Sequence, residues 1–160
     1  MKRVAIYVDI SNLYYSLKHK YGGRKLDYKK FLAYVEGDLG NIVLKRAYGA
    51  SKEGYAVGFK TMLSRLGFQT IYKIPVARMH KGELTHKADH DVTIAIDMVR
   101  YLDSADRIIL ASADGDMLPA IKYAVARGKD VIVLASGISN ELREYTTACI
   151  EIPESLLLGK

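Results

Sequence analysis

Two carboxylates stand one residue apart, directly after a run of apolar residues. The run Ile108–Ala111 is apolar enough for a buried strand, and Asp114 and Asp116 follow it on either side of Gly115. Two like charges at the edge of a core repel each other unless a cation lies between them. Because carboxylate oxygens are the ligands of hard cations, the pair predicts a Mg²⁺ or Mn²⁺ site. The simpler alternative is that Asp114 caps a following helix and Asp116 interacts favourably with its dipole.

Two further aspartates occupy positions from which they can join this pair. Asp9 closes the apolar run 3–9. Asp91 lies in the first turn of a helix expected over residues 88–102, and at about 100° per residue it falls in the middle of the apolar face. A core-facing aspartate is costly unless it is paired, hydrogen-bonded or metal-bound. The same projection places Asp97 on the more polar side, which favours a solvated or salt-bridged residue.

The rest of the chain supplies elements that can bring these residues together. Apolar runs of strand length alternate with helical patterns, which indicates a parallel sheet covered by helices on both faces. Strands are expected at 3–9, 41–49, 68–74, 107–113, 129–136 and 149–152, and helices at 10–21, 26–37, 52–67, 88–102, 115–128 and 140–148. Ser11 or Asn12 is expected near the cap of the first helix. A short exposed hairpin is expected within residues 75–87, turning at Lys81 and Gly82.

These elements predict an α/β fold of three layers, doubly wound, with strand order 3-2-1-4-5. In such a sheet, ligands bind at the carboxyl ends of the strands, where the winding reverses. The reversal in this order falls between strands 1 and 4. Asp9 is therefore predicted to lie beside Asp114 and Asp116, with Asp91 reaching them from its helix.

The charge distribution favours an anionic partner. The 160-residue chain has a net charge of +6, and residues 18–87 carry 15 Lys and Arg against 5 Asp and Glu. Residues 88–160 carry 7 Lys and Arg against 12 Asp and Glu. This pattern indicates a basic surface for a polyanion beside an acidic pocket, although solubility alone is the plainer explanation.

Length and cysteine content indicate the number of domains and the cellular compartment. A length of 160 residues suits a single domain, here expected over residues 1–160. The single cysteine, Cys149, cannot form an internal disulfide, which fits the cytoplasm. The N-terminal sequence lacks the pattern of a signal peptide, and no apolar stretch is long enough to span a membrane.

Four blocks of the sequence together resemble a known family. They are YVDISNLYYSL, KADHDVTIAIDMV, LASADGDMLPAI and SNELREYTTACIEI, at 7–17, 87–99, 110–121 and 139–152. In order and spacing they resemble the NYN domain of the LabA-like group, in the PIN-like nuclease superfamily. The resemblance implies a PIN-like Rossmannoid fold with an acidic, Mg²⁺-binding centre that is usually linked to RNA cleavage.

The resemblance also implies roles for single residues. The family's acidic set matches Asp9, Asp91, Asp114 and Asp116. Positions that orient ligands or contact the substrate match Asn12, Ser112 and Lys87, and Asp97 matches a frequent family aspartate with a supporting role. Two glycines of the family pattern are replaced, by Ile10 and Ala113.

The sequence therefore predicts a Mg²⁺- or Mn²⁺-dependent endoribonuclease in which the four aspartates hold the metal and an activated water attacks phosphorus. The expected partners are RNA or another nucleic acid, and a second copy of the chain in a homodimer. One alternative is a catalytically weak module that binds nucleic acid or regulates. Another is a haloacid-dehalogenase-like phosphatase, but that class has D-x-D at the first strand end, where this chain has Asp9-Ile10-Ser11.

Overall fold

A computed structural model describes the main chain of residues 1–50, 57–73, 76–80, 83–87 and 90–159. For residues 50, 57, 73, 76–80 and 83–87 it describes the main chain alone. The turn predicted at Lys81 and Gly82 lies outside the described residues, as does the start of the helix predicted from residue 52.

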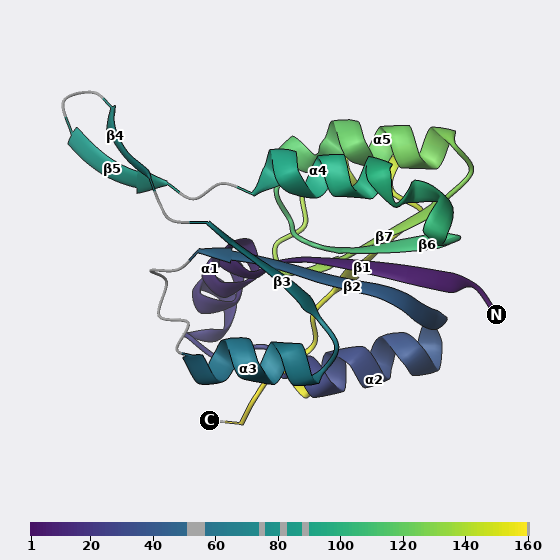
Figure 1. Ribbon diagram of the computed structural model, residues 1–160, viewed down its shortest axis with the longest axis horizontal. Coiled ribbons are helices and arrows are strands. Elements are labelled where there is room, and N and C mark those ends of the chain that lie inside the picture. Colours follow the sequence, from purple (N-terminus) through teal and green to yellow (C-terminus); the bar gives the residue numbers. More distant parts are fainter. Residues whose placement is uncertain (51–56, 74–75, 81–82, 88–89, 160) are drawn as a thin grey trace.

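The centre of the fold is a six-stranded sheet in which every pairing is parallel (Figure 1). Its strands are β1 (Arg3–Asp9), β2 (Asn41–Ala50), β3 (Gln69–Lys73), β6 (Arg107–Ala111), β7 (Asp130–Ala135) and β8 (Ala148–Glu151). They lie in the order β3-β2-β1-β6-β7-β8. The predicted order 3-2-1-4-5 is confirmed, and the predicted last strand joins the sheet at the β7 edge.

Helices cover both faces of this sheet. They are α1 (Ile10–Tyr21), α2 (Tyr28–Asp38), α3 (Val57–Arg65), α4 (Asp91–Arg100), α5 (Leu118–Ala126) and α6 (Asn140–Tyr145). Short 3-10 turns are η1 (Leu102–Ser104), η2 (Gly115–Met117) and η3 (Glu154–Leu156). Figure 1 shows α4 and α5 on one face and α2 and α3 on the other, which confirms the predicted three layers.

The core follows from the apolar runs that predicted the strands. Residues Val4–Val8 of β1 are at most 1% exposed, and Ile108–Ala111 of β6 at most 2%. A parallel strand between two helical layers is buried on both faces, so its sequence is continuously apolar rather than alternating. This is why the central strands were recognisable from sequence. No helix in the described part of the chain combines the length and apolar character needed to cross a membrane.

A separate hairpin consists of β4 (Val76–His80) and β5 (Glu83–Lys87). Its strands pair antiparallel, and Figure 1 shows it extending away from the sheet. The antiparallel strands of the predicted hairpin are confirmed in their main chain. Lys87 is the last residue of β5, opposite Val76, and its side chain lies outside the described atoms.

Several helix starts differ from the predictions in their capping residue or in their position. The cap of α1 is Asp9, not Ser11 or Asn12, since Asp9 is extended and accepts from the Asn12 N–H. The second helix starts at Tyr28 rather than at Leu26, which forms a β-bridge with Leu157. The helix predicted over 88–102 is shorter, with α4 starting at Asp91, and the one predicted from 115 starts as a 3-10 turn.

Candidate functional site

The winding of the sheet reverses between β1 and β6. Val8 of β1 lies opposite Ala111 of β6 in the parallel register, so Asp9 and Ser112 come next along the two strands. Asp9 and Ser112 are both buried, at 5% and 0% exposed. The carboxyl ends of β1 and β6 therefore lie side by side, as the predicted site requires.

Three aspartates form an acidic cluster at this edge of the sheet: Asp91, Asp114 and Asp116. One carboxylate oxygen from each lies within 4.8 Å of the others. Asp91 is buried and is the first residue of α4, Asp114 is half-buried, and Asp116 is exposed. The burial of Asp91 agrees with its predicted place on the core-facing side of the helix.

Asp9 is not a member of the acidic cluster. Its Oδ1 accepts a hydrogen bond from the Asn12 N–H at 3.1 Å, which caps α1. The structure thus brings three of the four predicted ligands together and holds Asp9 at the end of the neighbouring strand. The position taken by glycine in the family pattern is filled here by Ile10, which is 2% exposed and belongs to the core.

The loop after β6 is held by the polar side chains that the sequence singled out. Asn12 Oδ1 accepts a hydrogen bond from the Ala113 N–H at 2.9 Å. Ser112 Oγ accepts one from the Asp114 N–H at 3.2 Å, and Asp114 Oδ1 accepts one from the Asp116 N–H at 2.9 Å. Asn12 and Ser112 therefore shape the main chain that carries the acidic cluster. The simpler interpretation of Asp114, as a cap, is also realised.

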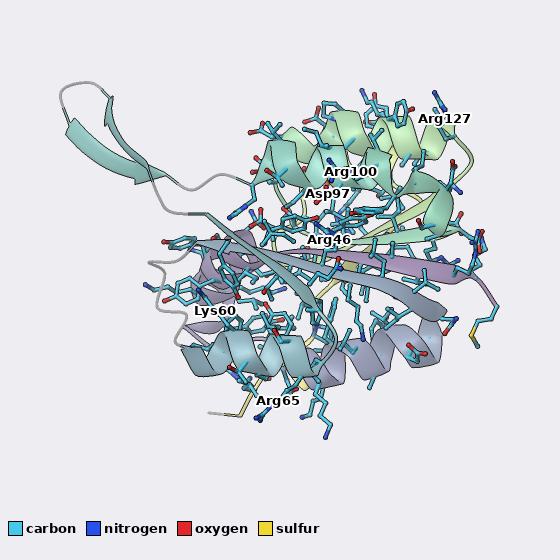
Figure 2. All side chains as sticks on the ribbon, viewed as in Figure 1. Arg46, Lys60, Arg65, Asp97, Arg100 and Arg127 are labelled. Carbon is cyan, nitrogen blue, oxygen red and sulfur yellow. The ribbon has the colours of Figure 1, made fainter. Side chains whose placement is uncertain are left out.

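Asp97 lies in a buried polar network between α4 and β2, where Figure 2 labels it beside Arg46. Its Oδ2 lies 3.1 Å from Arg46 Nη2 and accepts a hydrogen bond from the Tyr48 hydroxyl at 2.7 Å. Arg100 approaches Oδ1 at 3.7 Å, and Tyr7 donates to the main-chain oxygen of Asp97 at 3.4 Å. The prediction of a salt-bridged residue is confirmed, whereas that of a solvated one is wrong, because only 4% of Asp97 is exposed.

The network fixes protonation states as well as geometry. Burial raises the pKa of the Tyr48 hydroxyl above its usual range, and its hydrogen bond to Asp97 adds to the effect. Burial alone would lower the pKa of Arg46, but the hydrogen bond with Tyr48 and the charge of Asp97 raise it overall. Arg46 therefore stays charged and Tyr48 stays a neutral donor, so both continue to hold Asp97.

A second buried contact fixes the start of α4. His90, 1% exposed, immediately precedes Asp91, and its Nε2 donates to the main-chain oxygen of Gly49 at 2.8 Å. Gly49 lies near the end of β2. This bond and the Asp97 network attach α4 to β2 at two points, so the position of Asp91 is set by the sheet.

Sequence reasoning missed three of these residues: Arg46, Tyr48 and His90. Their partners are 41 to 51 residues away in the chain, and no local pattern marks such pairs. The bond of His90 to a main-chain carbonyl gives this buried histidine a structural role.

The acidic cluster fits a hard divalent cation. All of its donors are oxygens, which suit Mg²⁺ or Mn²⁺ and not the softer metals. Ligands of one Mg²⁺ at about 2.1 Å lie at most about 4.2 Å apart, close to the spread of this cluster. Asp114 and Asp116 lie in a hydrogen-bonded turn after β6, which fixes the main chain between them.

A parallel α/β sheet with an acidic cluster at its switch point is the architecture of the PIN-like nucleases, which usually use divalent metals. Within that superfamily, a sequence model of the NYN domain matches residues 3–153, and the chain belongs to this family. NYN domains are generally nucleases, so the family implies a nucleic-acid substrate and a hydrolase-type activity. The predicted resemblance is confirmed.

Individual relatives agree with the family assignment. The "Low amplitude and bright protein LabA" of Synechococcus elongatus is 28% identical, over 94% of this chain and 83% of its own length. The crystal structure of VPA0982, a Vibrio parahaemolyticus protein of unknown function, is also similar. It is 30% identical, with a TM-score of 0.84, and the match covers 98% of this chain and 96% of that one.

Proposed function

We propose that this protein is a Mg²⁺- or Mn²⁺-dependent endoribonuclease whose active site is centred on the acidic cluster. Asp91, Asp114 and Asp116 would hold the cation, and Asp9 would complete the site from the end of β1. The observation that carries the proposal is the convergence of three carboxylates from two separate segments, within 4.8 Å, at the switch point. Like charges at that spacing repel, so a cation between them stabilises the arrangement.

A divalent cation at this site would activate water for attack on phosphorus and neutralise charge on the phosphate. The chain's own residues supply the positioning. Asn12 and Ser112 hold the main chain of the loop that carries Asp114 and Asp116. The Asp97 network and His90 hold α4, and with it Asp91. These contacts keep the carboxylates in place without a ligand, which lowers the cost of binding one.

The basic part of the chain supports a nucleic-acid substrate, for which we propose RNA. Residues 18–87, with their excess of Lys and Arg, include the hairpin β4–β5 and Lys87, for which we propose a phosphate contact. The hairpin is joined to α4, whose first residue belongs to the acidic cluster. We further propose that residues 1–160 form one catalytic unit, which acts in the cytoplasm and can form a homodimer.

Cleavage of labelled RNA and DNA in Mn²⁺ or in EDTA tests the proposal. The wild-type protein should cleave RNA in Mn²⁺ only, and the Asp9→Asn/Asp114→Asn double variant should be inactive. Asp103→Asn is the matched control, because Asp103 is an exposed aspartate of η1 outside the cluster and should leave cleavage unchanged. Equal cleavage by the double variant would refute the mechanism. RNA binding without cleavage by the wild type would favour the binding-module alternative.

A binding experiment separates the metal site from turnover. Mn²⁺ at about 100 times its dissociation constant should stabilise the fold by about 2.7 kcal/mol. Asp91→Asn and Asp114→Asn should each remove most of this stabilisation in thermal unfolding, whereas Asp103→Asn should keep it. If Asp91→Asn and Asp114→Asn are both stabilised by Mn²⁺ as strongly as the wild type, the acidic cluster is not the metal site.

A further inference from the structure

A groove of about 570 Å³ runs between α4 and α5 and begins at the acidic cluster. Asp91 and Asp116 line it at one end, and the remaining lining is apolar or aromatic. Those residues are Val92, Ala95, Ile96 and Val99 of α4 and Pro119, Ala120 and Tyr123 of α5. Ligand sites have this composition, with mostly apolar walls and a few polar groups that fix orientation.

The apolar side of α4 that faces the groove is unusually open to solvent. Val92 is 71% exposed, Ile96 52% and Val99 46%, while Ile94 and Met98 on the sheet side are at most 1% exposed. α4 is thus apolar on two sides, and packing on the sheet uses only one. An exposed apolar stripe of this kind marks a binding surface.

We infer that this groove binds the nucleotides next to the scissile phosphate, with a base stacked on Tyr123. The inference rests on the proposed function, because it takes the occupant from the substrate of the acidic cluster. The groove and the cluster share Asp91 and Asp116, so an RNA strand whose phosphate lies at the cluster continues directly into the groove. Bases have apolar faces that stack on aromatic rings regardless of sequence.

Charge around the groove is complementary to such a strand. Beyond the acidic cluster, the exposed charges within α4 and α5 are Arg100 and Lys122, and Arg127 directly follows α5; all three are basic. Figure 2 labels Arg100 on α4 and Arg127 at the end of α5. The Arg127 guanidinium lies 4.6 Å from the Tyr123 ring centroid, so a cation already accompanies the proposed stacking surface. A phosphate beyond the stacked base would meet Arg127.

The same observations argue against a second copy of the chain as the occupant. A protein helix seated in the groove would lie over Asp91 and Asp116 and remove their charges from water, which is costly without a cation or a basic partner. A nucleic-acid strand brings a phosphate and its cation to that end and a base to the other.

The test is the affinity of a short single-stranded RNA, measured by fluorescence anisotropy in Ca²⁺, with an abasic residue placed at each position in turn. Tyr123→Ala should weaken binding by about 5- to 150-fold, the value of one stacked base. One abasic position should weaken wild-type binding similarly and should not weaken Tyr123→Ala further. Ile96→Glu, which places a negative charge in the groove, should also weaken binding.

Tyr145→Ala is the matched control. Tyr145 on α6 is 41% exposed, against 37% for Tyr123, and it has Lys122 over its ring at 4.1 Å, but it does not line the groove. Its substitution should leave the affinity unchanged. The inference is overturned if Tyr123→Ala binds RNA as the wild type does or if the wild type binds no RNA. It is also overturned if Ile96→Glu only dissociates a dimer in size-exclusion chromatography.

Cleavage in Mn²⁺ by the same proteins separates this inference from the proposed function. Unchanged kcat and KM in Tyr123→Ala would refute the groove while the nuclease proposal stands. Base-dependent binding at Tyr123 without any cleavage would support the groove and refute the proposed hydrolysis.

Discussion

Replacing Arg46 by methionine should destabilise the protein strongly, although the residue is far from the acidic cluster in sequence. The substitution removes the 3.1 Å ion pair with Asp97 and the 3.1 Å hydrogen bond from Arg46 Nε to the Tyr48 hydroxyl. The two charged side chains are 12% and 5% exposed, so the Asp97 charge would be left in a buried site. Removing one partner of a buried pair costs about 3–5 kcal/mol. Because Tyr48 and Arg100 still contact Asp97, we expect the lower end, about 3 kcal/mol.

Urea unfolding followed by circular dichroism measures this loss. Arg143→Met is the control, because its 2.9 Å ion pair with Glu151 has side chains 41% and 34% exposed and should contribute about 0–1 kcal/mol. The double variant Arg46→Met/Asp97→Leu, which leaves no buried charge behind, should recover much of the stability lost in Arg46→Met. A cost for Arg46→Met no larger than that of the control would refute the assignment of a stabilising buried pair.

The same residues decide what Asp97 does for the site. If Asp97 anchors α4, Asp97→Asn should lower stability and weaken Mn²⁺ binding only in proportion to the displacement of Asp91. If Asp97 held the metal, Asp97→Asn would abolish the Mn²⁺-induced rise in Tm as fully as Asp114→Asn. Titrating both variants with Mn²⁺ distinguishes these roles, and equal loss in the two would refute the anchoring role.

Three smaller predictions concern the supports of the fold and the loop. Asn12→Ala leaves a loop N–H without its acceptor and should cost about 1–3 kcal/mol in urea unfolding while weakening Mn²⁺ binding. Gly40→Ala should cost about 1–3 kcal/mol, since φ is +141° and the added Cβ would lie 2.5 Å from a main-chain oxygen. Hydrogen bonds from Arg3 lower the pKa of Asp106 to about 2. The contribution of Asp106 to folding stability is therefore complete above its unfolded-state pKa of about 3.9 and is lost as the pH falls toward 2. The difference in Tm between wild type and Asp106→Asn should therefore be constant near neutral pH and should disappear at acidic pH.

The sheet could be predicted from sequence because its signal is local. Each central strand is a short, continuously apolar run, and the parallel arrangement leaves few orders for the connections to follow. Asp91 could be predicted because a charged residue on the apolar face of a helix is conspicuous in a projection. The acidic cluster followed from combining these two signals at the switch point.

The supports of the site could not be predicted, because they join residues that are distant in the chain. Arg46 is on a strand where a half-buried arginine has no distinctive pattern, and its partner is 51 residues later. The groove was hidden for a different reason. Val99 is apolar but 46% exposed, whereas Ile94 and Met98 on the sheet side of α4 are at most 1% exposed. When a helix is apolar on two sides, periodicity does not identify which side packs on the sheet.

Asp114 shows why its two interpretations from sequence are not exclusive. Its Oδ1 caps η2 by accepting from the Asp116 N–H, and one oxygen of each aspartate in the cluster still lies within 4.8 Å of the others. A carboxylate has two oxygens and about four acceptor sites, so capping does not prevent it from binding a metal. The cap instead fixes the rotation of the carboxylate and the path of the main chain between the two aspartates. A replacement that keeps the cap but removes the charge, Asp114→Asn, should therefore retain stability within about 1 kcal/mol while losing Mn²⁺ binding. Equal loss of both in unfolding and titration experiments would mean that the residue serves the turn alone.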